Sequence, residues 1–241
     1  MANDLIKQGI ELFNSEKYAE AIQKLDEALK TANNPQQQVN VQYWLGRCYF
    51  DQARQTDDAT LFDKACRHFQ KQLECAENLN GDTGIEKQVY GQHWLGYCYF
   101  KYALQANNAA LFYDARTHFK EQSVQAKKLE HSNSNTSIEG QVNAQFWLGR
   151  CYLEQALQTG NTALFDKARQ HHQEQLALAK KLDGDTGIEE QANVQFWLGR
   201  CYLEQVRQTS NSALFDEAIL HFKQWLKYAA KLSEEKGIEQ Q

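Results

Sequence analysis

Apolar and small residues along this chain return in a pattern with a period of about fifty residues. The clearest marker is a block that opens with tryptophan, leucine and glycine, and its successive copies lie 50, 53 and 50 residues apart. The tryptophans of the four copies are Trp44, Trp94, Trp147 and Trp197. A fixed period in this range is typical of stacked repeats that bury their apolar faces against one another. We therefore predict an all-α chain that forms one elongated array over residues 1–241.

Each long repeat predicts two helices. In the first helix, apolar residues follow helical spacing, as at Val194, Leu198 and Cys201. A threonine followed three residues later by a glutamate, which is typical of a capping box, is expected to open three of these helices at Thr83, Thr136 and Thr186. The second helices are expected to begin at good N-cap residues, namely Asp58, Asn108, Asn161 and Asn211.

The predicted repeats follow from these signals. A shorter helix–turn–helix unit comes first, with small residues such as Gly9 where its two helices are expected to cross closely. The predicted bounds are 3–33 for this short repeat, about 36–80, 83–131, 136–183 and 186–233 for the long repeats, and 234–241 for the start of a further repeat or a tail.

Two motifs in this pattern match a known family. Residues Tyr18-x-x-Ala21-x-x-x-Leu25-x-x-Ala28 closely follow the second helix of the tetratricopeptide repeat, and Leu45-Gly46-x-x-Tyr49 follows its first helix. The chain thus resembles the tetratricopeptide repeat family, and its long units are similar to those of kinesin light chain and of LGN-type polarity adaptors. The resemblance implies a right-handed superhelical solenoid of antiparallel helix pairs that serves as a non-enzymatic scaffold for protein–protein interaction.

Charge and apolar runs narrow the class of partner. The formal net charge of −5 argues against non-specific binding to nucleic acid or to an anionic membrane. The chain has no apolar run near twenty residues and no basic-then-apolar leader, so we expect neither a membrane span nor a signal peptide. Four cysteines hold one position in each long repeat, and we interpret them as small buried thiols in a reducing, cytoplasmic compartment: Cys48, Cys98, Cys151 and Cys201.

The sequence carries no catalytic signature, so we predict no enzymatic activity and no cofactor. Histidines recur at one position of the second helices, at His68, His118, His171 and His221. Equivalent residues of stacked repeats lie a helix spacing apart, about 8–10 Å, and cannot converge on one metal ion. We therefore predict no metal site and interpret the histidines as packing residues between second helices.

A polar stripe on the first helices is the candidate binding site. Positions −4, −1, +3 and +7 from each tryptophan share one helical face, and the resemblance places this face in the inner groove. Asparagine offers a donor and an acceptor to a peptide backbone, arginine pairs with carboxylates, and aromatic rings supply contact area. The candidate peptide-binding residues are Asn40, Tyr43, Arg47, Tyr90, His93, Tyr97, Lys101, Asn143, Phe146, Arg150, Asn193, Phe196 and Arg200.

Two alternatives remain at this stage. The arginines stand four residues before the acids Asp51, Glu154 and Glu204, a spacing that is equally consistent with surface ion pairs on the helix. The asparagines are equally consistent with hydrogen bonds that link neighbouring repeats. The second alternative is a self-associating or regulatory arm of a larger protein whose effector domain is absent. Trp225 replaces a glutamine found at the equivalent sites. It predicts either a homodimer through the C-terminal helices or inward packing in a monomer.

Overall fold

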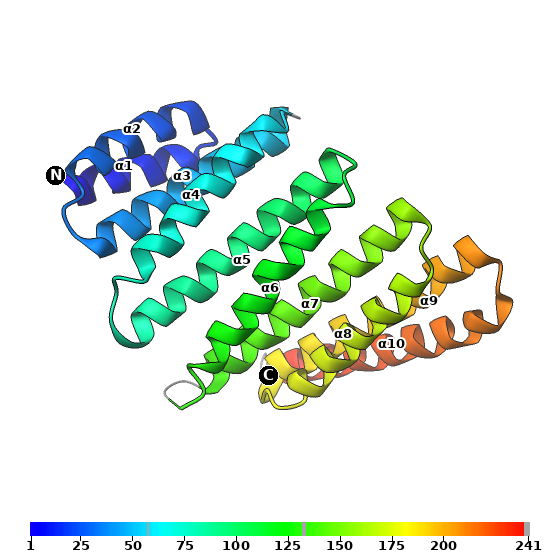
Figure 1. Ribbon diagram of the computed structural model, residues 1–241. Helices are drawn as coiled ribbons and strands as arrows, with labels where there is room; N and C mark the ends of the chain where they lie inside the picture. The colour runs from blue at the N-terminus through cyan, green and yellow to red at the C-terminus, as the bar shows by residue number, and fades with distance from the viewer. Residues whose placement is uncertain (57, 132–133, 239–241) are drawn as a thin grey trace. The chain divides into compact units, whose positions relative to one another are not determined.

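The structure is a computed structural model that describes residues 1–56, 58–131 and 134–238. These residues form helices joined by short turns, and no strand occurs among them (Figure 1). They separate into two compact units, Met1–Leu129 and Glu130–Gln241. The all-α prediction is confirmed, while the prediction of a single continuous array stays a prediction.

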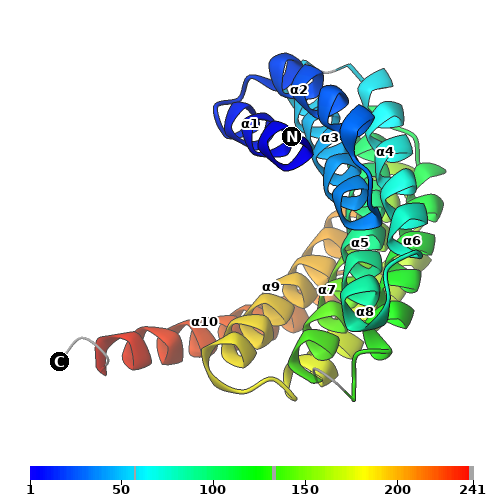
Figure 2. The same cartoon turned by 90° about the vertical axis from the view of Figure 1, so that its left-hand side faces the viewer.

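Unit 1 consists of three helix pairs, each made of two antiparallel neighbours. Helices α3 and α5 lie on one side of this unit and α4 and α6 on the other (Figure 2). Between pairs, α1 and α2 pack on α3, and α4 packs on α5. The pairs are α1 (Ala2–Asn14) with α2 (Tyr18–Thr31), α3 (Pro35–Thr56) with α4 (Thr60–Ala76), and α5 (Gly81–Gln105) with α6 (Leu111–Lys127).

Unit 2 contains two further pairs in its described residues. Helix α8 packs on α9, so the second helix of one pair contacts the first helix of the next, as α4 does with α5. Residues 234–238, which the sequence assigns to a further repeat or a tail, continue the last helix, and residues 239–241 lie outside the described residues. The pairs are α7 (Ser134–Thr159) with α8 (Ala163–Ala179), and α9 (Gly184–Thr209) with α10 (Phe215–Ile238), which follows the short 3-10 turn η1 (Ser212–Leu214).

The glycine of the repeated tryptophan block lets the two helices of a pair approach closely. A Cβ atom added to Gly46 would lie 2.7 Å from a ring carbon of Phe69. The same clash, at 2.9 Å, would arise between Gly199 and Phe222. In the short unit, a Cβ on Gly9 would lie 2.7 Å from Leu25, which confirms the expected close crossing. The tryptophan block thus marks a helix face that packs directly against an aromatic side chain.

The residues predicted as N-caps lie two to four positions before the first residue of each second helix, namely Thr60, Leu111, Ala163 and Phe215. The N-cap positions of α4, α6 and α8 are instead Ala59, Ala110 and Thr162, whereas Asn211 caps the short 3-10 turn η1. The Asp58 side chain accepts a hydrogen bond from the Thr60 backbone N–H at 2.9 Å. Asparagine does the same at the other three junctions, where each side chain accepts from the N–H group two residues further on. These bonds satisfy backbone N–H groups in the turn that leads into each second helix.

The predicted capping boxes are wrong. Helix α5 begins at Gly81, α7 at Ser134 and α9 at Gly184, so Thr83, Thr136 and Thr186 lie inside the helices rather than before them. Gly81 and Gly184 adopt φ values of +64° and +62°, which turn the chain into the new helix at a position that favours glycine. The glycine of the Thr-Gly-Ile-Glu motif has a steric role, because a Cβ on Gly84 would clash with the Leu79 carbonyl oxygen.

Candidate functional site

The first-helix face of unit 1 contains a hollow of about 290 Å³ between α3 and α5. Three of the predicted site residues, Asn40, Tyr43 and Tyr90, line it together. Gln72 of α4 and Lys87 of α5 complete the lining. Tyr90 is 58% exposed, so its ring offers free contact area at the rim. Here the structure brings together residues from two neighbouring repeats, as the polar stripe predicts.

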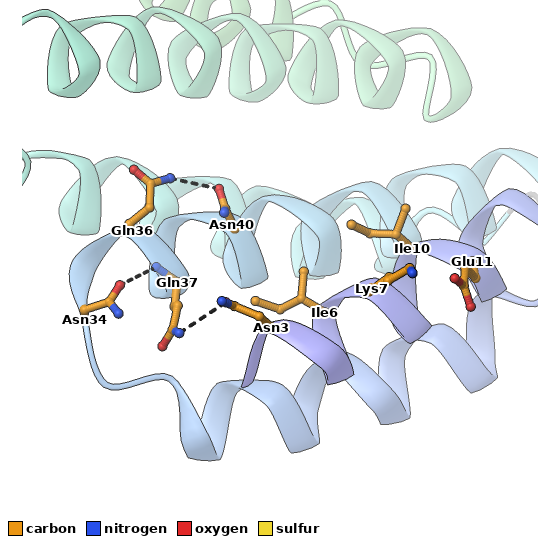
Figure 3. A pocket seen from close by; sticks show the side chains of 9 residues that line it. All are labelled: Asn3, Ile6, Lys7, Ile10, Glu11, Asn34, Gln36, Gln37 and Asn40. Carbon is orange, nitrogen blue, oxygen red and sulfur yellow. Dashed lines mark hydrogen bonds between the residues drawn. The ribbon is translucent and has the colours of Figure 1, made fainter. Parts of the chain in front are cut away.

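A second hollow, of about 790 Å³, lies between α1 and the beginning of α3 (Figure 3). Asn40 lines this hollow as well, so the two hollows meet at its side chain. Buried Ile6 and half-buried Ile10 supply apolar lining from α1. The complete lining is Asn3, Ile6, Lys7, Ile10, Glu11, Asn34, Gln36, Gln37 and Asn40.

Side-chain amides in the second hollow hold one another in place (Figure 3). Gln36 Nε2 donates to Asn40 Oδ1 at 3.1 Å, which leaves the Asn40 Nδ2 group to donate elsewhere. Gln37 Nε2 donates to Asn3 Oδ1 at 3.1 Å, a bond between α3 and α1. The result is a surface of oriented amide donors and acceptors beside an apolar wall, charged at Lys7 and Glu11.

The contribution of α1 was missed by the sequence analysis. The site pattern was counted from the tryptophans, and the short first repeat has no tryptophan. A signal was present in α1, where Asn3, Ile6, Lys7 and Ile10 are spaced along one helical face. Gln72 was missed because it lies on a second helix, α4, and Lys87 was missed because it lies on α5 about one turn before the first counted position.

The arginines of the stripe are engaged inside the protein. The Arg47 guanidinium carbon lies 4.1 Å from the centre of the Trp94 ring, and Arg150 lies 4.0 Å from that of Trp197. Each therefore stacks on the tryptophan of the next repeat within its own unit. Arg47 also donates to the Tyr43 hydroxyl at 3.0 Å and to Asp51 at 3.3 Å.

Burial adds to this structural role. The side chains of Arg47 and Arg150 are 21% and 18% exposed, and burial lowers the pKa of Arg150 from its usual value. Arg150 donates to Glu154 at 3.1 Å, so its charge is neutralised beside it. Arg200 differs, because it is 36% exposed and stacks at 5.0 Å on Trp197 of its own helix.

The second long repeat carries an aromatic cluster in place of this arginine. Tyr97 occupies the equivalent position and packs 5.2 Å from Phe50, while His93 lies parallel to Tyr97 at 6.2 Å between ring centres. Lys101 instead lines a separate hollow of about 320 Å³ with Arg54, Phe62, Leu104 and Gln105. The structure therefore does not bring Lys101 to the hollow that contains Asn40.

In unit 2 the predicted residues make contacts within and between repeats. The Phe146 ring packs 5.7 Å from Trp197, and the Phe196 ring packs 5.5 Å from Trp225. Burial raises the pKa of the Glu190 carboxyl, and the interactions of this carboxyl with Gln175 and Asn193 oppose that shift. Trp225 is half-buried and contacts its own pair through Phe196, while the choice between a homodimer and a monomer stays a prediction.

The recurring histidines form ties within each pair, not between second helices as the sequence analysis expected. His68 Nδ1 lies 2.7 Å from Gln42 Oε1, and its ring stacks on Tyr49 at 5.3 Å. The same contacts recur in every long repeat, with glutamine 26 residues before the histidine. We call each set a Tyr–His–Gln tie. In unit 1, burial lowers the pKa of His68 and of His118 to about 4.

Two other kinds of site are absent from the described residues. No cluster of three or more His, Cys, Asp or Glu side chains is placed to hold a metal ion there. Nor does any helix in that part of the chain have the length and apolar character needed to cross a membrane.

Part of the chain matches a known repeat family. Residues 6–72 match the family model of the tetratricopeptide repeat. A crystal structure of a putative kinesin light chain from Podosopora anserina, with nearly identical TPR-like repeats, superposes with a TM-score of 0.63. It is 17% identical, and the match covers 96% of each chain, so it shows the fold. The predicted resemblance and the helical-repeat fold are confirmed.

Other comparisons add little. The de novo designed helical repeat protein DHR64 covers 97% of this chain and 95% of its own, with 15% identity and a TM-score of only 0.39. No curated protein matches the chain. Tetratricopeptide repeats generally act as non-enzymatic scaffolds for protein–protein interactions.

Proposed function

We propose that unit 1 binds an extended peptide segment of a partner protein along α1, α3 and α5. The observation that carries this proposal is that two hollows, one on each side of α3, meet at Asn40. An extended peptide needs such continuity because each residue advances the chain by about 3.3 Å. Asn40 Nδ2 is placed to donate to a carbonyl of the peptide.

The remaining lining indicates what side chains the peptide carries. Ile6 and Ile10 favour an apolar side chain in the hollow beside α1. Lys87, next to Tyr43 and Tyr90, favours an acidic side chain over α5. This differs from the expectation that Arg47 and Arg150 receive the acidic groups, because both guanidinium groups already stack on tryptophan and pair with acids.

Selection from a peptide library tests this proposal. Twelve-residue random peptides would be selected on the full chain, and their affinities measured for wild type, Asn40→Ala and Tyr90→Ala. Loss of one hydrogen bond to a partner costs about 0.5–1.5 kcal/mol, so Asn40→Ala is expected to weaken binding about 2- to 13-fold. Tyr113, which is 68% exposed on α6, supplies the matched control Tyr113→Ala, expected to have no effect.

The predicted residues of unit 2 need a separate test. Asn143→Ala combined with Asn193→Ala is expected to weaken binding with little change in thermal stability if these side chains also contact the peptide. A lower melting temperature with unchanged affinity would show that they link repeats instead.

For the groove of unit 1, selected peptides that bind the Asn40→Ala and Tyr90→Ala variants as tightly as wild type would contradict the proposal. A cytoplasmic location stays a prediction from the sequence.

A second candidate function is self-association through α10, supported by the exposure of its outer face. Phe215 is 47% exposed, whereas its equivalents Phe62 and Phe165 are fully buried. Leu226 is 59% exposed, while the equivalent Leu73 is 6% exposed. Phe215, Ile219 and Leu226 share one face of α10, so this open apolar stripe, rather than Trp225, is the proposed contact.

Charge on α10 favours a second copy of this chain as the occupant of that face. Asp216 and Glu217 lie in its first turn, whereas Lys223 and Lys227 lie further along and are exposed. Antiparallel pairing of two α10 helices about a two-fold axis would place the acidic end of each beside the basic part of the other.

Analytical ultracentrifugation tests the dimer directly. Wild type is expected to dimerise at tens of micromolar, and the charge-introducing variant Leu226→Glu to remain monomeric, whereas Tyr113→Glu should behave as wild type. Wild type that stays monomeric throughout this range would refute self-association.

A further inference from the structure

Two cysteines from neighbouring repeats lie almost in bonding contact within unit 1. The Sγ atoms of Cys66 on α4 and Cys98 on α5 are 2.9 Å apart. This separation exceeds the length of a disulfide bond by only about 0.9 Å. Cys66 is 7% exposed and Cys98 is fully buried, so helix packing holds both side chains. Both thiols are free in the structure.

Among the described residues, a close contact between two cysteine sulfurs is given only at the α4–α5 junction. Cys98 belongs to the series of equivalent cysteines, but the position of Cys66 changes from repeat to repeat. At the corresponding α8–α9 junction, Arg169 replaces it, stacks on Tyr202 at 4.4 Å and donates to Gln205 at 2.7 Å. The repeat architecture alone therefore does not require a second thiol beside Cys98.

The two sulfur atoms differ in access and in chemistry. Cys98 lies in the core beside Phe62, whose carbonyl oxygen is 3.5 Å from its sulfur. Burial raises the pKa of Cys98 above its usual value, which keeps this sulfur protonated. Cys66 retains a small exposed area at the edge of the same apolar cluster. A small oxidant therefore reaches Cys66 first.

We propose that Cys66 and Cys98 form an intramolecular disulfide when the protein meets hydrogen peroxide. The Cys66 sulfur attacks one peroxide oxygen, the O–O bond breaks, and the products are a sulfenic acid and one water molecule. The Cys98 sulfur then attacks the Cys66 sulfur, its proton leaves with the departing hydroxyl as a second water, and the S–S bond forms. The two thiols lose two electrons in total, and these reduce the peroxide.

The bond would covalently link the two helices that supply three of the residues lining the smaller hollow. Helix α4 carries Gln72 and helix α5 carries Lys87 and Tyr90, all of which line the smaller hollow. The disulfide would fix the spacing between these elements and constrain the unfolded chain over the residues between the two cysteines. The chemistry itself is independent of peptide binding, so its test does not require a ligand.

Mass spectrometry under denaturing, non-reducing conditions tests the proposal with hydrogen peroxide as the probe. Oxidised wild type is expected to lose about 2 Da and to retain four of its six alkylatable thiols. Proteolytic mapping should find the peptides of Cys66 and Cys98 joined, and a reducing agent should restore six thiols. Thermal unfolding of the oxidised protein should shift upward, and reduction should reverse the shift.

Variants separate this bond from other oxidation. Cys66→Ala and Cys98→Ala should each abolish the loss of 2 Da, while Cys75→Ala, at a half-buried cysteine on the same helix as Cys66, should preserve it. Circular dichroism would confirm that each variant is folded, and Cys66→Ser at the less buried position serves if Cys98→Ala does not fold. Peroxide-treated wild type in which Cys66 and Cys98 both remain alkylatable would overturn the proposal, as would a cross-link that survives in Cys98→Ala.

Discussion

The environment of these arginines depends on whether the first helix of another long repeat, with its tryptophan, packs beside them in the same unit. Arg47 stacks on Trp94 and is 21% exposed, whereas Arg200 stacks on its own Trp197 and is 36% exposed. A stacked guanidinium contributes about 0.5–1 kcal/mol at an exposed site and up to about 2 kcal/mol when desolvated. The same residue type therefore has unequal energetic weight at equivalent positions.

We predict that Arg47→Gln lowers the free energy of unfolding by about 1–2 kcal/mol, because it removes the contact with Trp94 and the ion pair with Asp51. Arg200→Gln is the matched control and should cost about 0.5 kcal/mol or less. Urea unfolding followed by circular dichroism measures both. Equal losses in the two variants would show that stacking on the next repeat contributes nothing extra.

Gly46 leads to a prediction opposite in sign to helix propensity. In an open helix, replacing glycine by alanine stabilises by about 1 kcal/mol. Here the added Cβ would lie 2.7 Å from the buried Phe69 ring, so Gly46→Ala is expected to destabilise by about 1–3 kcal/mol. Adding Phe69→Leu should show favourable coupling between the two substitutions in a double-mutant cycle. A gain in melting temperature for Gly46→Ala alone would contradict the clash.

At the scale of elements, side-chain chemistry predicted the second helices better than the first. Asn161 accepts from the Ala163 N–H at 3.2 Å, as its residue type predicts. The starts at Gly81 and Gly184 were not predicted, because the left-handed φ of these glycines depends on how the preceding helix meets the next one. The Thr-Gly-Ile-Glu motif could be seen in the sequence, but the close approach of Gly84 to the Leu79 carbonyl oxygen could not.

This distinction can be measured with two alanine substitutions in unit 2. Asn161→Ala removes the bond to the Ala163 N–H and should destabilise by about 1 kcal/mol. Thr186 is exposed and lies inside α9, so Thr186→Ala should change stability by less than about 0.5 kcal/mol. If Thr186→Ala costs as much as Asn161→Ala, Thr186 acts as a helix cap after all.

At the scale of the whole molecule, periodicity was sufficient to predict the fold and insufficient to assign the site. Repeat spacing identifies the helix pairs, because each pair must bury its apolar face. It also placed Asn40, Tyr43 and Tyr90 on one surface, and all three line the hollow between α3 and α5. It did not show that Arg47 stacks on Trp94, because that contact depends on the distance between neighbouring first helices. Nor did it include α1, whose repeat lacks the tryptophan used for counting.

The Tyr–His–Gln ties make stability depend on pH. Burial lowers the pKa of His68 and His118 to about 4 in the folded protein, against 6.5 for an unperturbed histidine. Between these values the unfolded chain binds protons that the folded chain does not, so stability decreases as pH falls. From pH 7.5 to 5.5 we predict a loss of about 1 kcal/mol for each of the two histidines.

Urea midpoints across this pH range measure the effect. His68→Gln should flatten the dependence even if it lowers stability at every pH, because one titrating group is removed. His131→Gln, at an exposed histidine, should leave the dependence unchanged. A wild-type midpoint that does not move between pH 7.5 and 5.5 would contradict the neutral state of these side chains.

The exposed apolar face of α10 also predicts which helix of unit 2 unfolds locally before the others. Helix α9 is covered by both α8 and α10, whereas α10 contacts α9 and η1 alone among the described helices and exposes Phe215 and Leu226. Amide protons in α10 are therefore expected to exchange with deuterium well before those of α9, because separating α10 breaks fewer apolar contacts. Within unit 2, local unfolding is therefore expected to begin at α10 and to reach α9 only afterwards.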